Sequence, residues 1–551
     1  MCECLLLLAF FLVTPASGTT PTNPASEKNS EVAKSRIQAT FLKAPLHFEA
    51  NQGQTDEQVK FVARGGGYSL FLTATEAVME LRQGQQQTDP VGLKQSRAFS
   101  LNPKSSVLRM NLVGANTHAT VAGLQELSGK ANYFISNDAN KWTTNISTYA
   151  KVEYRDVYPG VNLVYYGNQG KLEYDFVVSP GSDPGAIKIA FEGAEEIKTD
   201  GRGDLIIRTA IGDLHMHKPL VYQEVAGVKK EISGEYVLSP ESAIPFPKLI
   251  TVGLHMAAYD ATKPLVIDPV LSYSTYLTPT SAAQGIAVDS LGNVYIAGGS
   301  GTAFITKLDP AGALVYSTQL GGAGYSEADS IAIDSSGNIC VVGTTSAPNF
   351  PTVNAYQPVY GGGGSDAFVA KLAPNGSTLL FSTFLGGSGD DHGTGCAMDG
   401  AGNAYISGYQ FPGSSNFPIV NGYQPTFGGG SGDGFFSVLS ASGSTLLYST
   451  YLGGGDLDAA AKVAVDLSGK AYVSGYTFSG NFPTKNAFQS THAGAADVFV
   501  AKFDITKAGN DSLLYSTFLG GSDREAGYAL AVDAVATPSW QVLPCPQIFQ
   551  S

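Results

Sequence analysis

Short runs of hydrophobic and β-branched residues, separated by glycine-rich turns, follow one another through the second half of the chain. The clearest copy lies at residues 462–519, where four runs read KVAVD, AYVSGY, DVFVAKF and LLYSTFL. Runs of this length, rich in Val, Tyr, Phe and Thr, are typical of β-strands, and the Gly, Asp and Asn between them are typical of turns. The pattern therefore predicts a unit of four antiparallel strands.

The unit repeats, and one marker keeps its place in every copy. This marker, Asp-x-x-Gly-(Asn/Lys), recurs at intervals of 45, 65 and 67 residues. It begins at Asp289, Asp334, Asp399 and Asp466. A period of this size with four strands per unit is the composition of a β-propeller blade. We expect β-propeller repeats over residues 269–533.

The ends of the repeat region differ from its middle. About four complete four-stranded blades are predicted, flanked by two orphan strands, one at residues 271–277 and one at residues 529–533. The residues that follow, 534–551, have neither the turn nor the second strand of the repeat and form an atypical tail. We therefore expect an incomplete propeller, in a chain that is truncated or frame-shifted near Asp533. The alternative is a complete protein whose tail covers the open edge.

The first half of the chain has strand-like runs without this repeat. Residues 162–179 read as a hairpin with GNQG at its bend, and no helical periodicity extends beyond short pieces. Residues 41–268 therefore predict a β-rich N-terminal domain, either a β-sandwich or a pair of packed sheets. Residues 19–40 are rich in Thr, Pro, Asn and Ser and predict a linker.

The repeat motifs resemble a known family. YSTYLGG, AVDSxGNxYVxG, NFPTxNAYQ and DAFVAKL occur in fixed order over about residues 271–533 and resemble the bacterial β-propeller repeat called SBBP. Residues 45–73, together with 218–225 and 264–277, resemble the uncharacterised domain that often precedes such repeats. The resemblance implies an exported or surface-associated bacterial protein with a propeller fold. It implies no catalytic residues.

Two kinds of long connection are expected to share one face of the disc. Successive strands of a blade run in opposite directions, so the first and third connections lie on one face and the second and fourth on the other. The second connection contains Asn-Phe-Pro, and the fourth is the glycine-rich segment between blades. Because ligands are often bound by loops on a rigid scaffold, this face is the candidate binding surface. Its candidate residues are Asn349, Phe350, Tyr356, Asn416, Phe417, Tyr423, Asn481, Phe482 and Phe488. The alternative is that these side chains attach each loop to its neighbours.

The recurring aspartates have a structural explanation. Each carboxylate can accept backbone N–H groups within its turn while the following Gly adopts a positive φ, so Asp289, Asp334, Asp399 and Asp466 are predicted to stabilise turns. A calcium-ligand role is the alternative. The segment GGGGSDAF at 361–368 also fits a calcium-binding nonapeptide, but such sites need tandem copies. We expect no metal site and no cofactor.

The acidic composition of the chain argues against nucleic acid as a binding partner. The net charge is −14, and residues 271–533 contain 8 Lys and Arg against 19 Asp and Glu. An acidic surface repels phosphate backbones, so nucleic acid is not an expected partner. Charged residues make up only 15% of the chain and Gly is abundant at 65 residues, as expected for short strands joined by tight turns.

The N-terminus predicts export. Residues 5–13 form an apolar run that is too short to span a bilayer but fits the core of a signal peptide. Ala16 and Gly18 are small residues suited to a cleavage site after residue 18, although no Lys or Arg precedes the apolar run. A signal peptide is therefore expected at 1–18, with an extracytoplasmic location for the mature chain. No transmembrane segment is expected.

Three functions remain open from the sequence. The first is a non-enzymatic binding or scaffold protein, with a glycan or a protein as its ligand. The second is a propeller enzyme that acts on extracellular polysaccharide, with Asp390, Asp391 and Asp433 as acid and base. The third is a structural protein of the cell envelope. The enzyme requires its carboxylates to converge at about 5–10 Å.

Overall fold

The computed structural model describes residues 46–65, 68–82, 105–168, 171–225, 227–240, 250–269, 271–273, 282–299, 301–413, 416–532 and 538–544. The helical pieces in these ranges are 3₁₀ turns of three residues each: η1 (Ala139–Lys141), η2 (Pro184–Ala186) and η3 (Gly509–Asp511). The all-β fold class predicted from the sequence is confirmed. The predicted signal peptide and linker lie outside the described residues.

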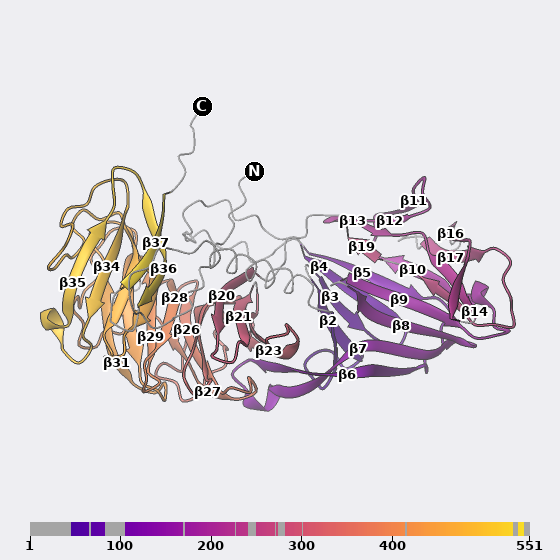
Figure 1. Ribbon diagram of the computed structural model, residues 1–551, viewed down its shortest axis with the longest axis horizontal. Coiled ribbons are helices and arrows are strands. Elements are labelled where there is room, and N and C mark those ends of the chain that lie inside the picture. The colour runs from indigo at the N-terminus through magenta and orange to yellow at the C-terminus, as the bar shows by residue number, and fades with distance from the viewer. Residues whose placement is uncertain are drawn as a thin grey trace, which may run out of the picture.

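The N-terminal region contains a large curved sheet and a small one (Figure 1). The strands of this region that belong to the large sheet are β1 (Phe48–Ala50), β2 (Phe61–Gly65), β3 (Tyr68–Leu72), β4 (Glu76–Arg82), β5 (Ser105–Leu112), β6 (Thr120–Ile135), β7 (Thr143–Tyr158), β8 (Val161–Asn168), β9 (Lys171–Val178), β10 (Lys188–Glu192), β14 (Leu220–Val225), β15 (Val228–Ile232), β16 (Gly234–Pro240), β17 (Ile250–Met256) and β18 (Leu265–Asp268). The small sheet comprises β11 (Glu196–Thr199), β12 (Leu205–Thr209), β13 (Gly212–Met216) and β19 (Leu271–Tyr273).

The two sheets bury one shared apolar core. Tyr165 and Tyr174 of the large sheet and Ile207 and Met216 of the small sheet belong to the same buried cluster. Alternation along the strands produces this core, since every second residue of β8 is buried. The N-terminal region is therefore sandwich-like, as the sequence predicted.

The second half forms blades of four antiparallel strands in chain order. Blade 1 contains β20 (Ala282–Val288), β21 (Val294–Gly299), β22 (Ala303–Leu308) and β23 (Leu314–Gly321). Blade 2 contains β24 (Ser326–Ile333), β25 (Ile339–Thr345), β26 (Asp366–Leu372) and β27 (Leu379–Leu385). Blade 3 contains β28 (Asp391–Met398), β29 (Ala404–Gln410), β30 (Asp433–Leu439) and β31 (Leu446–Leu452). Blade 4 contains β32 (Asp458–Val465), β33 (Ala471–Thr477), β34 (Asp497–Phe503) and β35 (Leu513–Leu519).

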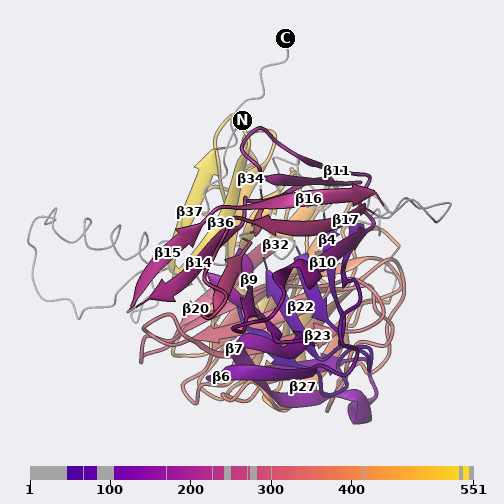
Figure 2. The ribbon, with the colours of Figure 1, turned by 90° about the vertical axis from the view of Figure 1, so that its right-hand side faces the viewer.

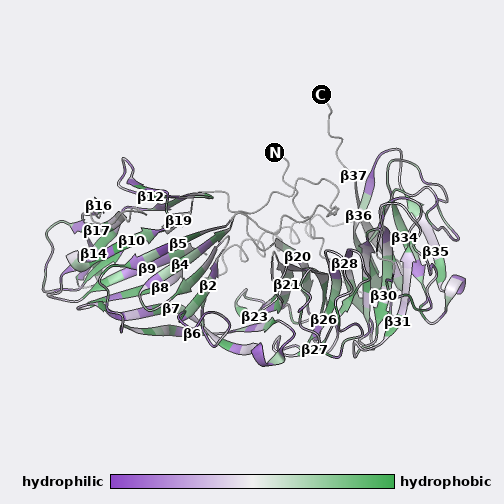
Figure 3. Cartoon of the chain, turned by 180° about the vertical axis from the view of Figure 1, so that it is seen from behind, coloured by the Kyte–Doolittle hydropathy of each residue, from purple (hydrophilic) through white to green (hydrophobic). Residues whose placement is uncertain are grey.

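Consecutive blades stack through their first strands, which contact one another from β20 to β32. The middle strands are buried on both faces, as in β25, β26, β29 and β30. Hydrophobic residues accordingly concentrate on the blade strands, whereas the connections between them are paler or hydrophilic (Figure 3). Each of these units has the four antiparallel strands that the repeat predicted.

The two strands expected to stand alone both have partners. β19, the described part of residues 271–277, pairs with β13 in the small sheet. β36 (Glu525–Val532) pairs with β37 (Pro538–Pro544), which lies within the tail that was expected to lack a second strand. Neither strand is therefore an orphan. The tail was misread because Pro538–Pro544 has none of the residues that mark the second strand of the other repeats.

The N-terminal region joins the propeller through a strand pairing that the sequence did not reveal. β23, the fourth strand of blade 1, pairs in parallel with residues 130–135 of β6. Figures 1 and 2 show the end of β6 beside blade 1. Asn132 Nδ2 donates to Thr318 Oγ1 at 3.3 Å, and Thr318 Oγ1 donates to the Gly376 carbonyl in blade 2 at 2.8 Å. One continuous sheet therefore spans the two halves of the chain.

An ion pair between the buried Glu49 and the partly exposed Arg64 holds this part of β6 on its own sheet. Arg64 Nη1 lies 3.1 Å from Glu49 Oε2, and the Tyr133 hydroxyl donates to the same carboxylate oxygen. Burial by itself raises the pKa of Glu49, but the charge of Arg64 and the hydrogen bonds from His47 and Tyr133 outweigh it and lower this pKa from 4.5 to about 2. The cluster connects β1, β2 and β6.

The Glu49 cluster predicts a stability loss in acid. The folded pKa lies below the unfolded one, so the stabilisation is complete above about pH 5 and is lost as the pH falls from 4.5 towards 2. Between pH 6 and pH 3, the free energy of unfolding of the wild type should fall by about 2 kcal/mol more than that of Glu49→Gln. Urea denaturation at both pH values measures this difference. Glu57→Gln, at an exposed site, should behave like the wild type; equal pH dependence in wild type and Glu49→Gln would refute the assignment.

Candidate functional site

The long connections between the second and third strands follow the outer edge of each blade. They span residues 346–365 in blade 2 and 478–496 in blade 4, and the described parts in blade 3 are 411–413 and 416–432. In each, two residues form antiparallel bridges to the fourth strand: Val353 to Ser382 and Gln357 to Phe384, Val420 to Ser449 and Gln424 to Tyr451, and Lys485 to Ser516 and Gln489 to Phe518. These long connections, the rim loops, therefore cover the free edge of the fourth strand, and only their ends remain at the predicted face.

The phenylalanines of the Asn-Phe-Pro segments are core residues. Phe350, Phe417 and Phe482 are 0%, 5% and 3% exposed. Each ring lies 4.4–4.6 Å, centroid to centroid, from a phenylalanine of the third strand, namely Phe368, Phe435 or Phe499. Each therefore attaches its rim loop to its own blade, which is the alternative that the sequence left open for these three residues.

The asparagines of these segments differ in their contacts. Asn349 Oδ1 accepts the Ala323 N–H at 2.7 Å, and Asn481 Oδ1 accepts the Gly455 N–H at 2.8 Å. Ala323 and Gly455 belong to the glycine-rich connections between blades, so the two kinds of connection meet directly. The side chains of Asn416 and Asn481 are exposed, whereas Asn349 is half-buried. Of these three asparagines, Asn416 and Asn481 are therefore the ones that are accessible to solvent.

The aromatic residues in the middle of the rim loops pack between blades where a following turn is present. The Tyr356 N–H donates to the Gly443 carbonyl of blade 3 at 3.0 Å, and its ring is half-buried. Tyr423 is also half-buried, and burial raises its pKa. Phe488 occupies the same place in blade 4 and is 91% exposed. The final sheet, β36–β37, has only two strands among the described residues and places no such turn against Phe488.

The recurring aspartates occupy both carboxylate oxygens in their turns. Asp289 Oδ1 accepts the N–H groups of Leu291 and Asn293 at 3.0 and 2.9 Å, and Oδ2 accepts from the Asn293 amide and the Tyr295 hydroxyl. Asp334, Asp399 and Asp466 repeat the two backbone contacts. The Gly of the turn has a positive φ in every copy, for example +82° at Gly292. Turn chemistry therefore accounts for these carboxylates.

Lysines of the third strands add charge to two of these turns. Lys371 Nζ lies 3.2 Å from Asp334 Oδ2 and donates to the Gly402 carbonyl of blade 3 at 2.9 Å. Lys502 Nζ lies 3.7 Å from Asp466 Oδ2. Burial would raise the pKa of Asp334, yet its hydrogen bonds and Lys371 together lower it. The lysine of DAFVAKL thus ties a turn of one blade to the next blade.

Two of the three carboxylates proposed for catalysis share one face of blade 3, but both are fully buried. Asp391 and Asp433 are fully buried and begin strands β28 and β30, which are separated within blade 3 by β29. Both are cross-strand neighbours of Gln410 in β29, so the two side chains project from the same face of blade 3. Asp390 accepts the Gly364 N–H at 2.5 Å in a loop. The geometry does not present these residues together to a polysaccharide.

Sequence reasoning named Asp391 and Asp433 as acids but missed that acidic residues pair at the blade junctions. In blades 2 to 4 an aspartate opens the third strand, and an acidic residue opens the first strand of the next sheet. These residues are Asp366, Asp433 and Asp497, with Asp391, Asp458 and Glu525. Their signal was present in DAFVAKL, DGFFSVL and DVFVAKF and in the acids that end each glycine-rich connection. Only the fold shows that the two kinds of acid meet.

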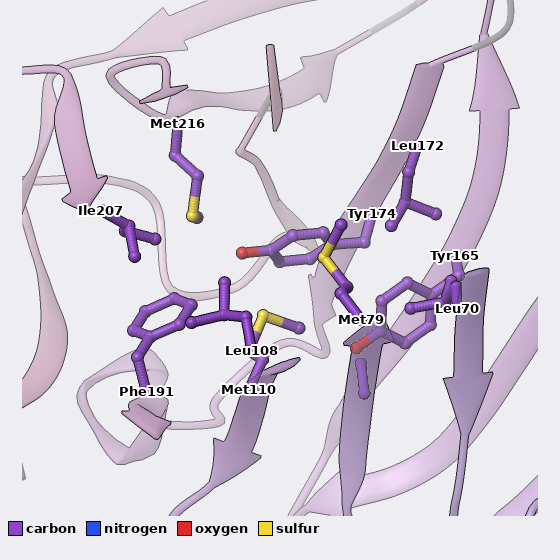
Figure 4. A pocket seen from close by; sticks show the side chains of 11 residues that line it. Leu70, Met79, Leu108, Met110, Tyr165, Leu172, Tyr174, Phe191, Ile207 and Met216 are labelled. Carbon is purple, nitrogen blue, oxygen red and sulfur yellow. The ribbon is translucent and has the colours of Figure 1, made fainter. Parts of the chain in front are cut away.

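One cavity lies in the core of the N-terminal region, between the two sheets (Figure 4). Leu70, Met79 and Leu108 line it from the large sheet, and Ile207 and Met216 line it from the small sheet. Its volume is about 20 Å³. Ligand sites for small molecules occupy roughly 300–1,000 Å³, so this cavity is a packing defect.

The two aromatic positions of a rim loop predict opposite effects of truncation. Phe417→Ala removes a buried ring and should lower the free energy of unfolding by about 3–5 kcal/mol. Phe488→Ala removes an exposed ring and should change it by less than about 0.5 kcal/mol. Urea denaturation of the two variants measures both. A small effect of Phe417→Ala would show that the rim loop is not attached to its blade through this ring.

Family models match part of each half of the chain. The family model "Domain of unknown function (DUF7948)" matches residues 48–270, and the model "Beta-propeller repeat", SBBP, matches residues 273–301 and 315–351. No curated protein matches.

Two solved structures are similar to this chain. A protein of unknown function from Bacteroides caccae is 11% identical, with 59% of this chain and 92% of that chain covered and a TM-score of 0.25. The Dos1 propeller is 12% identical, with 67% of this chain and 89% of that chain covered and a TM-score of 0.26. TM-scores this low support no inference about the fold or the function of this chain. Within the ranges that the structure describes, no helix is both long and apolar enough to cross a membrane. The chain is an SBBP β-propeller repeat protein with a DUF7948 domain in front of its repeats.

Proposed function

We propose that this protein is an exported, non-enzymatic scaffold or binding protein. The observation that carries the proposal is that the side chains conserved from one repeat to the next within this chain are buried in the packing of the blades. Phe350, Phe417 and Phe482 fill the blades. Asp391 and Asp433, which could have acted as acid and base, are fully buried. A chain that uses its repeated residues in this way is suited to holding a rigid shape.

The proposed ligand surface is the part of the predicted face that packing leaves free. Asn416 and Asn481 are exposed there, and the Asn481 amide oxygen accepts the Gly455 N–H of a glycine-rich connection. Exposed amides on a rigid support suit hydrogen bonding to a glycan or to a protein loop. The acidic net charge of −14 favours a partner other than nucleic acid.

A structural role in the cell envelope is the second candidate. It is favoured by the half-buried rings of Tyr356 and Tyr423, which belong to the packing between blades and leave little aromatic surface for a ligand. Export is supported by the signal-like residues 1–18 and by the SBBP repeats. Under either function the mature chain acts outside the cytoplasm, and its N-terminal residue should be Thr19.

Glycan-array binding by the secreted full-length chain tests the proposal. The double variant Asn416→Ala/Asn481→Ala should lower the melting temperature only slightly, because both residues are exposed and a single hydrogen bond, from the Gly455 N–H to Asn481 Oδ1, is lost, and it should lower the array signal at least tenfold. Leu467→Ala, an exposed residue in a turn of the opposite face, should leave the signal unchanged.

Two outcomes would count against this function. Absence of any glycan signal from the wild type would reject the glycan ligand and favour the envelope role. Release of reducing sugar from a polysaccharide panel by the wild type, but not by Asp391→Asn, would reject the non-enzymatic assignment.

A further inference from the structure

Pairs of acidic side chains face each other at three successive blade junctions. In each pair the first acid opens the third strand of a blade, and the second opens the first strand of the following sheet. The pairs are Asp366 with Asp391, Asp433 with Asp458, and Asp497 with Glu525. A glycine that directly follows the fourth strand lies between the two members, and these glycines are Gly386, Gly453 and Gly520.

The glycine keeps a small space open between the two carboxylates. A Cβ atom on Gly453 would stand 2.5 Å from Asp433 Oδ1 and 2.9 Å from Asp458 Oδ2. At Gly386 the corresponding distances are 2.8 Å to Asp366 Oδ1 and 2.9 Å to Asp391 Oδ2, and at Gly520 they are 2.4 Å to Asp497 Oδ1 and 2.9 Å to Glu525 Oε2. Both acids therefore direct oxygen atoms to one point at every junction.

One oxygen of each acid at the middle junction is fixed by hydrogen bonds, and the other is not. Asp433 Oδ2 accepts the Gly428 N–H at 2.5 Å, and Asp458 Oδ2 accepts the Gly454 N–H and the Ser479 hydroxyl at 2.7 and 2.8 Å. The Oδ1 atoms of both residues are buried without a hydrogen-bond partner, and both residues are 0% exposed. The unpartnered Oδ1 of Asp433 is the atom that faces Gly453, whereas Asp458 turns its hydrogen-bonded Oδ2 towards that glycine. Buried carboxylate oxygens without a partner are costly, so they require a positively charged or donating species.

The same unpartnered oxygens recur at the outer two junctions. Asp366 Oδ1, Asp497 Oδ1 and Glu525 Oε2 are buried and accept no hydrogen bond. In blade 3, Gln410 is 1% exposed, is the cross-strand neighbour of Asp433, and also has an unpartnered Oε1. Cross-strand neighbours project from the same face of a sheet, so this amide adds a neutral oxygen donor beside the acid.

Charge at the middle junction is not balanced by a protein cation. Within the described part of the chain, neither Asp433 nor Asp458 forms an ion pair with Lys or Arg. Two buried carboxylates that face one space repel each other unless something positive lies between them.

The junction between blades 1 and 2 shows that the fold does not require the acids. Thr302 and Ser326 occupy the equivalent positions there, and Gly321 is the equivalent glycine. A Cβ on Gly321 would stand 3.2 Å from Thr302 Cγ2 and 3.6 Å from Ser326 Oγ. The same backbone arrangement thus forms with small uncharged side chains. The acids at the other three junctions are therefore not needed for the fold, and we attribute to them the binding of a ligand.

We propose that each of the three acidic junctions binds one calcium ion between its two carboxylates. Oxygen-only donors select a hard cation, and Ca²⁺ accepts irregular arrangements of carboxylates, amide oxygens, backbone carbonyls and water more readily than Mg²⁺. Because each site takes one acid from each of two consecutive sheets, the ion holds the sheets together. Calcium thereby stabilises the stack of blades.

Calcium titration of the full-length chain tests this proposal. The protein is treated with EDTA, desalted and titrated with CaCl₂ at pH 7.5 in 150 mM NaCl by isothermal calorimetry, with melting temperatures measured in parallel. Uptake of about three ions per chain and a rise in melting temperature of several degrees are expected. No uptake, or an equal rise on adding NaCl of matched ionic strength, would overturn the proposal; saturation by Mg²⁺ but not by Ca²⁺ would overturn the choice of ion.

Variants at one junction separate an ion from a shared proton. Asp433→Asn should reduce the uptake from three ions to two, should melt higher than the wild type in EDTA because a repulsion is removed, and should show a smaller calcium-dependent rise. Asp458→Asn should give the same results, which guards against a folding defect in one variant. Ser326→Ala, at the junction without acids, should keep three ions.

A gain of function provides an independent check. Thr302→Asp/Ser326→Asp rebuilds the acidic pair at the first junction and should raise the uptake to four ions. Unchanged uptake in both Asp433→Asn and Asp458→Asn would contradict the site. A wild type that is stabilised by lowering the pH from 7.5 to 5.5 but not by calcium would show that the pairs hold a proton instead.

Discussion

Covering the outer edge of the fourth strand is the constraint on which the rest of this structure depends. A free strand edge exposes unpaired N–H and C=O groups and invites pairing with another chain. In blades 2, 3 and 4 the rim loop lies along that edge and bridges to it at two positions. Blade 1 has no such loop, and there β6 of the N-terminal region pairs with β23 instead. In blade 1, β6 of the N-terminal region therefore takes the place of the missing rim loop and covers the edge of the fourth strand.

This constraint explains why the most recognisable motif of the repeat contributes little open surface. The Phe of each Asn-Phe-Pro segment fixes the loop to its blade, and the middle aromatic residue packs against the next blade where a turn is present. What remains for an external partner is the polar end of each loop. Two further devices join the blades: lysines that reach the recurring Asp turns, and the acidic pairs at the junctions.

Features encoded within a few residues could be predicted from the sequence. The four-stranded repeat is visible because strand length, turn residues and period all act locally, and the Asp-x-x-Gly turn follows from the reach of one carboxylate to its own backbone. Contacts between distant segments could not be predicted in this way. The partner of β23 is more than 180 residues away in β6, and Asp433 meets Asp458 only because a strand and a glycine-rich connection bring them together. Phe350 and Phe488 come from similar motifs, yet one is buried and the other exposed, since exposure depends on which neighbours the fold places beside them.

Hydrogen exchange of the fourth strands tests the covered-edge account most directly. Peptides from β23, β27, β31 and β35 are compared in the full-length protein by mass spectrometry. If every outer edge is covered, amides across each strand are hydrogen-bonded, and all four peptides, including the one from β23, should exchange slowly. Rapid exchange of about half the amides of β23, while the other three strands remain protected, would show that β6 does not cover blade 1 and would contradict the account.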